Sequence, residues 1–249
     1  MSFQDYFSKH SGLYALARPR YPDELFQYLS SITKSHNTVW DCGTGNGQAA
    51  LSLAAHFKKV IGTDASEAQI KNSFKHPGIE YRVATAEDSG LENQSVDLVT
   101  AATAAHWFDL KKFYPEARRV LKPGGIIAVW TYTETRSEKN LDEIFHRLGR
   151  EILDDYWPKG RENVWNKYAD LFFPFEEIKA PTFQCRATWN LAELINYLNS
   201  WSASQHYAST HGFSPVDLVL SELQKAWADP LNKREIRWEL GLRVGKTAQ

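Results

Sequence analysis

A glycine-rich turn constrains this chain more than any other feature of its sequence. Residues 41–47 read Asp-Cys-Gly-Thr-Gly-Asn-Gly and separate a short apolar run, 38–42, from a segment with helical spacing of Ala, Leu and Phe, 48–57. Glycines allow a tight turn with positive φ and let a ligand approach the backbone closely. The helix that follows offers free N–H groups and partial positive charge at its start. The turn therefore predicts a strand, a ligand-binding loop and a helix, in that order.

Strand and helix signals alternate on both sides of this turn. Strands are predicted at 38–42, 60–64, 79–83, 96–100 and 126–132. Helices are predicted at 48–57, after Ser66 as N-cap, and at 110–121 with Asp109 as N-cap. Such alternation implies parallel strands joined by right-handed crossovers. The expected fold is α/β: a doubly wound, mostly parallel, seven-stranded Rossmann-like sheet with a helical insertion after the fifth strand. Ligands of such sheets bind beyond the carboxyl ends of the strands, where the glycine turn falls.

Two acidic residues bear on which ligand the turn would hold. Asp41 stands two residues before the first glycine, where it would repel a pyrophosphate but could accept hydrogen bonds from a ligand ammonium or order the loop. A dinucleotide loop has the spacing G-x-G-x-x-G, whereas this chain has G-x-G-x-G. Asp64 closes the second predicted strand, where a carboxylate can accept both hydroxyls of a ribose. A nicotinamide-dinucleotide-dependent oxidoreductase, and a glycine turn without any ligand, remain alternatives.

These residues resemble the cofactor motif of class I S-adenosylmethionine-dependent methyltransferases. The similarity continues through 86–88, 95–99, 106–108 and 119–125, and it reappears at 14–22 and 237–245. The last two segments resemble a trans-aconitate methyltransferase-like subgroup. The resemblance covers most of the chain, and it implies that S-adenosylmethionine is the cofactor.

The resemblance also implies a set of cofactor-binding residues, which are Tyr14, Arg18, Asp41, Gly43, Gly45, Gly47, Asp64, Ala65, Thr85, Ala86, Glu87 and Ala102. The glycines would wrap the cofactor, Asp41 would lie near its amino-acid end, and Asp64 would hold the ribose. Residues 85–87 would border the adenine, and 101–105 would run under the methionine part. The amino-terminal segment would cover the pocket, where Arg18 could meet the methionine carboxylate or an acidic substrate.

Four residues are candidates for the acceptor side of the site. His106 and Trp107 lie just past the fourth predicted strand, where the sulfonium would sit. His106 is the candidate catalytic residue, because it could orient the substrate or act as a base. Trp107, Trp130 and Tyr132 are the candidate substrate contacts. A buried Trp and a rim His bonded to backbone are the competing structural interpretations.

We expect one domain over residues 1–249, divided into four parts. These are an amino-terminal cover segment with the first helix (1–34), the cofactor-binding core (38–132), a helical insertion that forms a substrate lid (137–180), and closing strands and helices (181–249). In the closing part we expect strands at 182–189 and 234–246 and helices at 190–200 and 214–228. The lid is rich in Trp and Tyr, which favours a small, partly apolar acceptor.

Charge and composition exclude several other partners. The formal net charge is −1, so no general attraction to nucleic acid or to an anionic membrane is expected. No apolar stretch has membrane-spanning length, no signal peptide is visible, and no cluster has metal-ligand spacing. The sequence thus predicts a cytoplasmic methyltransferase without a metal, acting on a small molecule. A carboxylate acceptor would need no base, whereas a hydroxyl would need one. A non-catalytic S-adenosylmethionine-binding protein is a further alternative.

Overall fold

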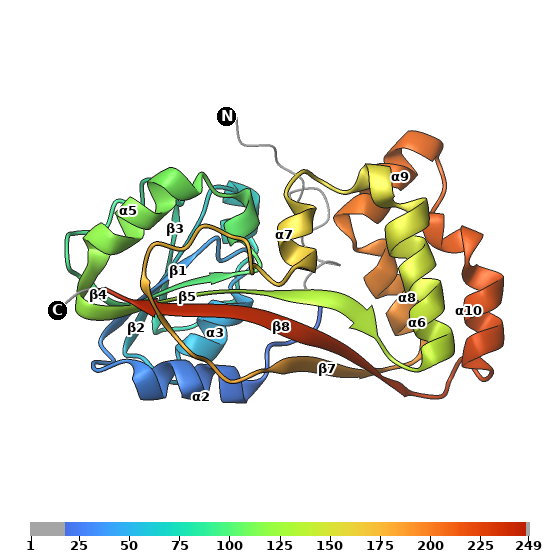
Figure 1. Ribbon diagram of the computed structural model, residues 1–249, viewed down its shortest axis with the longest axis horizontal. Coiled ribbons are helices and arrows are strands. Elements are labelled where there is room, and N and C mark those ends of the chain that lie inside the picture. Colours follow the sequence, from blue (N-terminus) through green and yellow to red (C-terminus); the bar gives the residue numbers. More distant parts are fainter. Residues whose placement is uncertain (1–17, 248–249) are drawn as a thin grey trace.

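One mixed β-sheet with helices on both faces organises the chain in the computed structural model, which describes residues 18–247 (Figure 1). The strand order is β3-β2-β1-β4-β5-β8-β6, and β7 pairs with β8. The strands are β1 (Thr38–Cys42), β2 (Lys59–Asp64), β3 (Ile79–Val83), β4 (Val96–Ala102), β5 (Leu121–Arg136), β6 (Glu176–Ile178), β7 (Gln184–Trp189) and β8 (Arg234–Lys246). The first five strands are parallel to one another, and β8 runs antiparallel to β5, β6 and β7. The predicted α/β fold is confirmed.

The last position of this sheet holds two strands instead of one. Strand β8 spans 13 residues. Its carboxyl-terminal end, Val244–Lys246, pairs with β6, and its amino-terminal half, Arg234–Glu239, pairs with β7. Both partners lie on the edge of β8 that faces away from β5. The expected seven positions are therefore filled by eight strands, because β8 is long enough to pair with two short ones.

Helices cover the two faces of the parallel strands and build two separate cores. The covering helices are α2 (Asp23–Ile32), α3 (Gln48–Leu53), α4 (Glu67–Lys71) and α5 (Leu110–Val120). Successive residues of a strand point to opposite faces, so Val39 of β1 packs with α2 and α3 while Trp40 packs with α5. The predicted N-caps are confirmed: the Ser66 hydroxyl accepts from the Gln69 N–H at 3.3 Å, and the Asp109 carboxylate accepts from the Lys111 N–H at 3.2 Å.

A lobe of helices lies beyond the carboxyl end of β5, where β5 and β8 extend past the other strands (Figure 1). This helical lobe consists of α6 (Lys139–His146), the π-helical segment η2 (Arg147–Ile152), α8 (Leu191–Asn199), α9 (Ser202–His211) and α10 (Leu220–Trp227). Leu141, Leu194 and Leu223 from three of these helices share one buried cluster. The helices of the predicted closing part thus pack with the first helix of the predicted lid.

One short helix stands between the lobe and the parallel strands. Helix α7 (Arg161–Trp165) contacts β5 and the 3-10 turn η1 (Ala105–Trp107) that follows β4. Because η1 lies at the carboxyl edge of the sheet, α7 brings the predicted insertion to the place where a ligand of this fold would bind.

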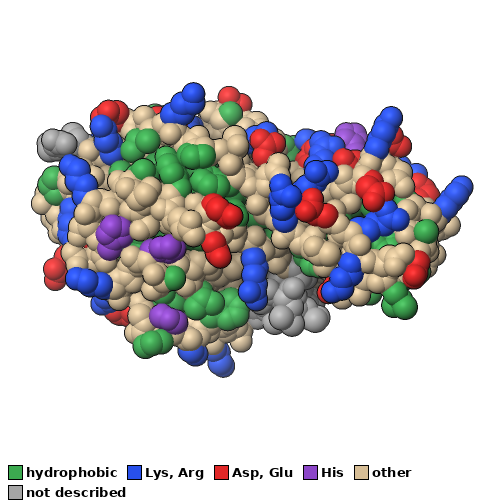
Figure 2. Space-filling view, turned by 90° about the horizontal axis from the view of Figure 1, so that it is seen from below, with side chains coloured by type: hydrophobic (Ala, Val, Ile, Leu, Met, Phe, Trp, Pro, Cys, Tyr) green, Lys and Arg blue, Asp and Glu red, His purple; other side chains and the backbone are tan. Residues whose placement is uncertain are grey.

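The surface seen from below mixes positive and negative side chains. Lys and Arg lie among Asp and Glu over this face, without a continuous stripe of one sign (Figure 2). Within residues 18–247, each helix is too short or too polar to span a bilayer.

Candidate active site

The glycine turn has the backbone that the sequence predicts. Gly43, Gly45 and Gly47 have φ values of 65°, 56° and 87°, in the region that favours glycine. A Cβ on Gly47 would lie 2.0 Å from the Tyr81 hydroxyl, and one on Gly43 would lie 2.6 Å from Cβ of Ala104. A Cβ on Gly45 would meet no described atom within 4 Å. Two of the glycines therefore allow close packing, while the third leaves open space beside the backbone.

Asp41 ties this turn to the neighbouring strand. Its side chain is fully buried and accepts hydrogen bonds from the Thr44 hydroxyl at 2.6 Å and the Thr100 hydroxyl at 2.7 Å. Burial raises the pKa of Asp41 to about 6, although the two hydroxyls favour the ionised form. The sequence left two roles open for Asp41, contact with a ligand ammonium and ordering of the loop. These contacts show that Asp41 orders the loop. Contact with a ligand remains a prediction.

Asp64 lies half-buried at the end of β2 and links two backbone segments. One carboxylate oxygen accepts from the Gly45 N–H and the other from the Ser66 N–H, each at 2.9 Å. Each oxygen of an ionised carboxylate has a second lone pair, so Asp64 can still accept hydroxyls from a sugar. Together with the open space at Gly45, this arrangement fits a nucleoside with an amino-acid tail.

The remaining predicted cofactor residues lie along the same edge of the sheet. Ala65 follows β2, Ala102 ends β4, and Thr85 forms an isolated bridge with Asp88 after β3. The Glu87 carboxylate accepts from the Asp109 N–H at 2.9 Å, which fixes the loop of residues 84–88, including the buried Ala86, to the start of α5. Tyr14 lies outside the described residues. The cofactor roles of all these residues remain predictions.

His106 has a partner that the sequence did not indicate. Its Nδ1 lies 2.7 Å from the Tyr168 hydroxyl, and its ring centroid lies 4.9 Å from that of Trp107. Burial, with a contribution from Arg161, lowers the pKa of His106 to about 3. His106 is therefore a neutral imidazole and a weak base at neutral pH. No local pattern marks Tyr168, because it follows α7 and reaches His106 only through tertiary packing.

The candidate substrate residues differ in their exposure. Trp107 is 37% exposed at the rim, and the Tyr132 hydroxyl accepts from an Arg18 N–H at 2.6 Å. Arg18 also donates to the carbonyl of Ser200 at 3.0 Å, so it connects β5 with the end of α8. Trp130 is fully buried in the core, with its ring edge-to-face against Tyr21 at 5.6 Å. The Trp130 side chain therefore exposes no surface that supports the predicted contact with a substrate.

Comparisons with known proteins agree along most of the chain. A family model described as a methyltransferase domain matches residues 40–129. A protein of Dictyostelium discoideum named as a methyltransferase is 37% identical over 229 residues, which cover 90% of this chain and 87% of the relative. A protein of Saccharomyces cerevisiae named as an S-adenosylmethionine-dependent methyltransferase is 26% identical, with 86% of this chain and 87% of the relative covered.

A solved structure extends the similarity to the helical lobe. A protein of Anaeromyxobacter dehalogenans described as a type II methyltransferase is 39% identical and superposes with a TM-score of 0.86, covering 92% of this chain and 97% of its own. The covered share of this chain is larger than the sheet alone, so the similarity includes residues of the helical lobe.

Proposed function

The chain belongs to the S-adenosylmethionine-dependent methyltransferases, and from that premise we propose that it methylates a carboxylate of a small molecule. Family membership decides against the dinucleotide-dependent oxidoreductase. The segments 14–22 and 237–245 support the finer proposal of a trans-aconitate methyltransferase-like member. S-adenosylmethionine supplies a methyl group already activated on a sulfonium. The protein's part is then to align the acceptor and to exclude water.

The cofactor assignment rests on the open face of the glycine turn. Gly45 presents its backbone to open space, and the carboxylate of Asp64 stands beside it and accepts from its N–H. In this proposal Asp64 holds the ribose hydroxyls, residues 85–87 border the adenine, and Ala102 lies under the methionine part. Asp41 acts through the loop that its buried carboxylate orders.

The pair of His106 and Tyr168 is the observation that carries the acceptor proposal. A hydroxyl acceptor must lose a proton, which calls for a base with a pKa near the working pH. His106 is a weak base, with a pKa of about 3, and its Nδ1 is occupied by Tyr168. A carboxylate has an ordinary pKa of about 4 and is already ionised at neutral pH. His106 is thus better suited to positioning an ionised acceptor through Nε2 than to removing a proton.

The packing around α7 supports an enclosed acceptor site. In this proposal Trp107 and Tyr132 form the rim of the acceptor site. Residues 137–180 form its lid, together with α8, α9 and α10 of the helical lobe. An enclosed site between a sheet edge and an aromatic lid suits a small molecule.

The experiment is methyl transfer from cofactor labelled at the methyl carbon to a set of small carboxylic acids. Alkali hydrolyses a methyl ester and releases volatile labelled methanol, whereas methyl ethers, methylamines and C-methyl products keep the label. We expect volatile label. Label that survives alkali would contradict carboxylate methylation. Binding of S-adenosylhomocysteine without transfer to any acid would favour the non-catalytic alternative.

A further inference from the structure

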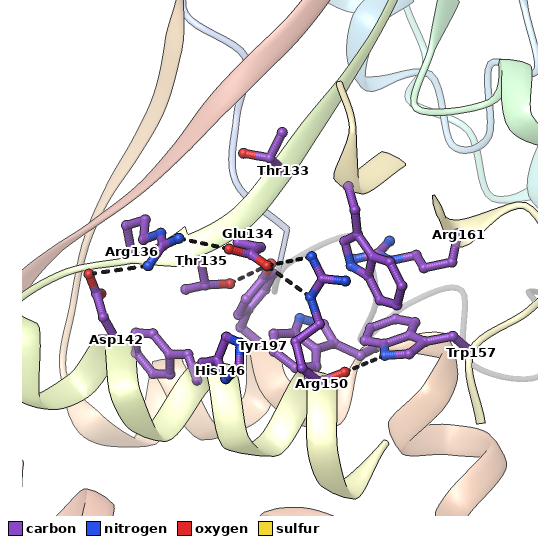
Figure 3. Close-up of a pocket in the computed structure, with 14 residues that line it drawn as sticks. Thr133, Glu134, Thr135, Arg136, Asp142, His146, Arg150, Trp157, Arg161 and Tyr197 are labelled. Atoms are coloured by element: carbon purple, nitrogen blue, oxygen red, sulfur yellow. Dashed lines mark hydrogen bonds and ion pairs between the residues drawn. The ribbon is translucent and has the colours of Figure 1, made fainter. Parts of the chain in front are cut away.

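A small cavity lies between the end of β5 and α6, η2, α7 and α8, and among the described residues its lining contains none of the predicted cofactor residues (Figure 3). Its volume is about 40 Å³. Aromatic side chains form much of its wall, contributed by Trp157, Trp165, Tyr197 and Trp201. A cavity of this size accommodates one small polar group and not a whole metabolite.

The two carboxylates in the cavity wall are already paired. Glu134 binds Arg136 through one oxygen at 2.8 Å and Arg150 through the other at 2.8 Å. Asp142 accepts from the Ser137 N–H at 2.6 Å and lies 3.8 Å from an Arg136 nitrogen. Both acidic groups are thus held by Arg136 and Arg150. A third guanidinium lines the same cavity, that of Arg161.

Arg161 is the cationic residue of this cavity that has no acidic partner among the described residues. No hydrogen bond or ion pair joins its guanidinium to any residue between 18 and 247, and its Nε is buried. Figure 3 accordingly draws no dashed line to it. The guanidinium instead lies over the ring of Trp157, whose centroid is 4.1 Å from the guanidinium carbon. A buried charge without a counter-ion is costly, which suggests that the counter-ion arrives with a ligand.

Arg161 also lies near His106, the residue that positions the acceptor in the proposed function. Gly160, directly before Arg161, has a φ of 88°, and a Cβ there would lie 3.2 Å from the carbonyl oxygen of His106. The start of α7 therefore packs on the backbone of His106. The guanidinium of Arg18 adds positive potential near Arg161. An anion bound at Arg161 would thus lie between the lid and the rim of the sheet.

We propose that Arg161 is the specificity-determining residue of the acceptor site, and that it pairs with an anionic group of the acceptor inside this cavity. The planar guanidinium offers parallel N–H donors to a carboxylate or a phosphate monoester, which share this chemistry. The cavity holds only that group, and the carbon skeleton of the acceptor extends from it toward His106. This inference rests on the proposed function, because it places the acceptor next to His106.

The test measures binding of small probes to protein saturated with S-adenosylhomocysteine. Acetate, benzoate and phenyl phosphate are compared with the neutral isosteres acetamide and benzamide at constant ionic strength, by titration calorimetry and thermal shift. Arg161→Met removes the charge and keeps the stem, and Arg161→Lys keeps the charge. Arg147→Met is the matched control, since Arg147 lies on the same segment as Arg150, does not line this cavity and is paired with Glu222.

We expect at least one anionic probe to bind, its neutral isostere not to bind, and Arg161→Met to weaken binding at least tenfold. Arg161→Lys should bind with intermediate affinity, and Arg147→Met should bind as the wild type does. Stronger binding of phenyl phosphate than of benzoate assigns the group to a phosphate monoester, and the reverse assigns it to a carboxylate. No anion-dependent binding to the wild type, or equal binding to Arg161→Met, would overturn the proposal.

Two further readouts separate this proposal from its premise and from a structural role. Arg161→Met should bind S-adenosylhomocysteine as the wild type does, and a loss would move Arg161 to the cofactor side and overturn the proposal. The ligand-free variant should melt no lower than the wild type, because it loses an unpaired buried charge, whereas a structural role predicts a lower Tm. Failure of the wild type itself to bind S-adenosylhomocysteine would count against the proposed function.

Discussion

Nδ1 of His106 and the hydroxyl oxygen of Tyr168 lie 2.7 Å apart although 62 positions separate them in the sequence. Tyr168 and the preceding Lys167 both have a φ of 62°, a strained value for residues other than glycine. Lys167 lies against β8, where a Cβ on Gly241 would come within 2.5 Å of its Cα. The strained pair therefore fixes the end of the α7 segment on β8 and aims Tyr168 at the imidazole. Through this contact the insertion sets the position of the rim histidine.

Removing the Tyr168 hydroxyl should separate positioning from cofactor binding. Tyr168→Phe leaves Nδ1 of His106 without its partner, which should lower the free energy of unfolding by about 1–3 kcal/mol. We expect slower methyl transfer but unchanged affinity for S-adenosylhomocysteine, and His106→Ala should show the same separation. Denaturant unfolding, calorimetric titration and steady-state kinetics measure the three quantities.

Tyr114→Phe is the matched control for that change. Tyr114 is 1% exposed and its hydroxyl has no hydrogen-bond partner among the described residues, so its removal should not destabilise the fold. A Tyr168→Phe variant as stable and as active as Tyr114→Phe would show that the contact with His106 is dispensable. Loss of cofactor affinity in His106→Ala would place that residue on the cofactor side.

Asp64 should contribute directly to cofactor affinity. Asp64→Ala removes a charge-assisted hydrogen bond, so S-adenosylhomocysteine should bind more weakly by about 1.5–3 kcal/mol. Because Asp64 also accepts from the Gly45 N–H, the melting temperature of the ligand-free variant must be measured beside the titration. Glu80→Gln, on the neighbouring strand β3, controls for the change in net charge. Equal affinities in Asp64→Ala and the wild type would refute the ribose assignment.

Local signals in the sequence predicted the parallel core and both helix caps, because the glycine turn, Ser66 and Asp109 act within a few residues. The helix α9 was missed because its sequence, SASQHYASTH, has little apolar periodicity. The strand β6 was missed because it has only three residues. The contacts of Tyr168 and Arg161 could not be predicted, since they depend on how α7 packs against η1. The glycine turn proposed for the cofactor was therefore visible in the sequence, whereas the contacts proposed for the acceptor depend on the tertiary structure.

Two glycines of the turn should respond differently to the same substitution. Gly47→Ala puts a methyl group 2.0 Å from the Tyr81 hydroxyl, and overpacking together with the positive φ should cost about 2–4 kcal/mol of stability. Gly45→Ala meets no described atom within 4 Å, so it should cost only about 1–2 kcal/mol through its φ. The methyl group of Gly45→Ala enters the space proposed for the cofactor, so the affinity for S-adenosylhomocysteine should fall at least tenfold. Wild-type affinity in Gly45→Ala would show that the open space is not the cofactor's approach.

The buried carboxyl of Asp41 should give the ligand-free protein a specific pH dependence. Burial raises its pKa in the folded state to about 6, from an ordinary value of 3.8, so the folded state holds the proton more tightly than the unfolded state. Its contribution to stability is thus fully present below about pH 4 and is lost as the pH rises through 6.

Asp41→Asn removes this titration and keeps one acceptor oxygen for the hydroxyls of Thr44 and Thr100. At about 1.4 kcal/mol per pKa unit, the stability of Asp41→Asn relative to the wild type should rise by about 2–2.5 kcal/mol between pH 4 and pH 7. Denaturant unfolding of both proteins at half-unit steps of pH measures this difference and cancels the titration of every other group. A difference that stays constant over this range would mean that Asp41 titrates alike in the folded and unfolded chains. The carboxyl that orders the glycine turn would then not be desolvated.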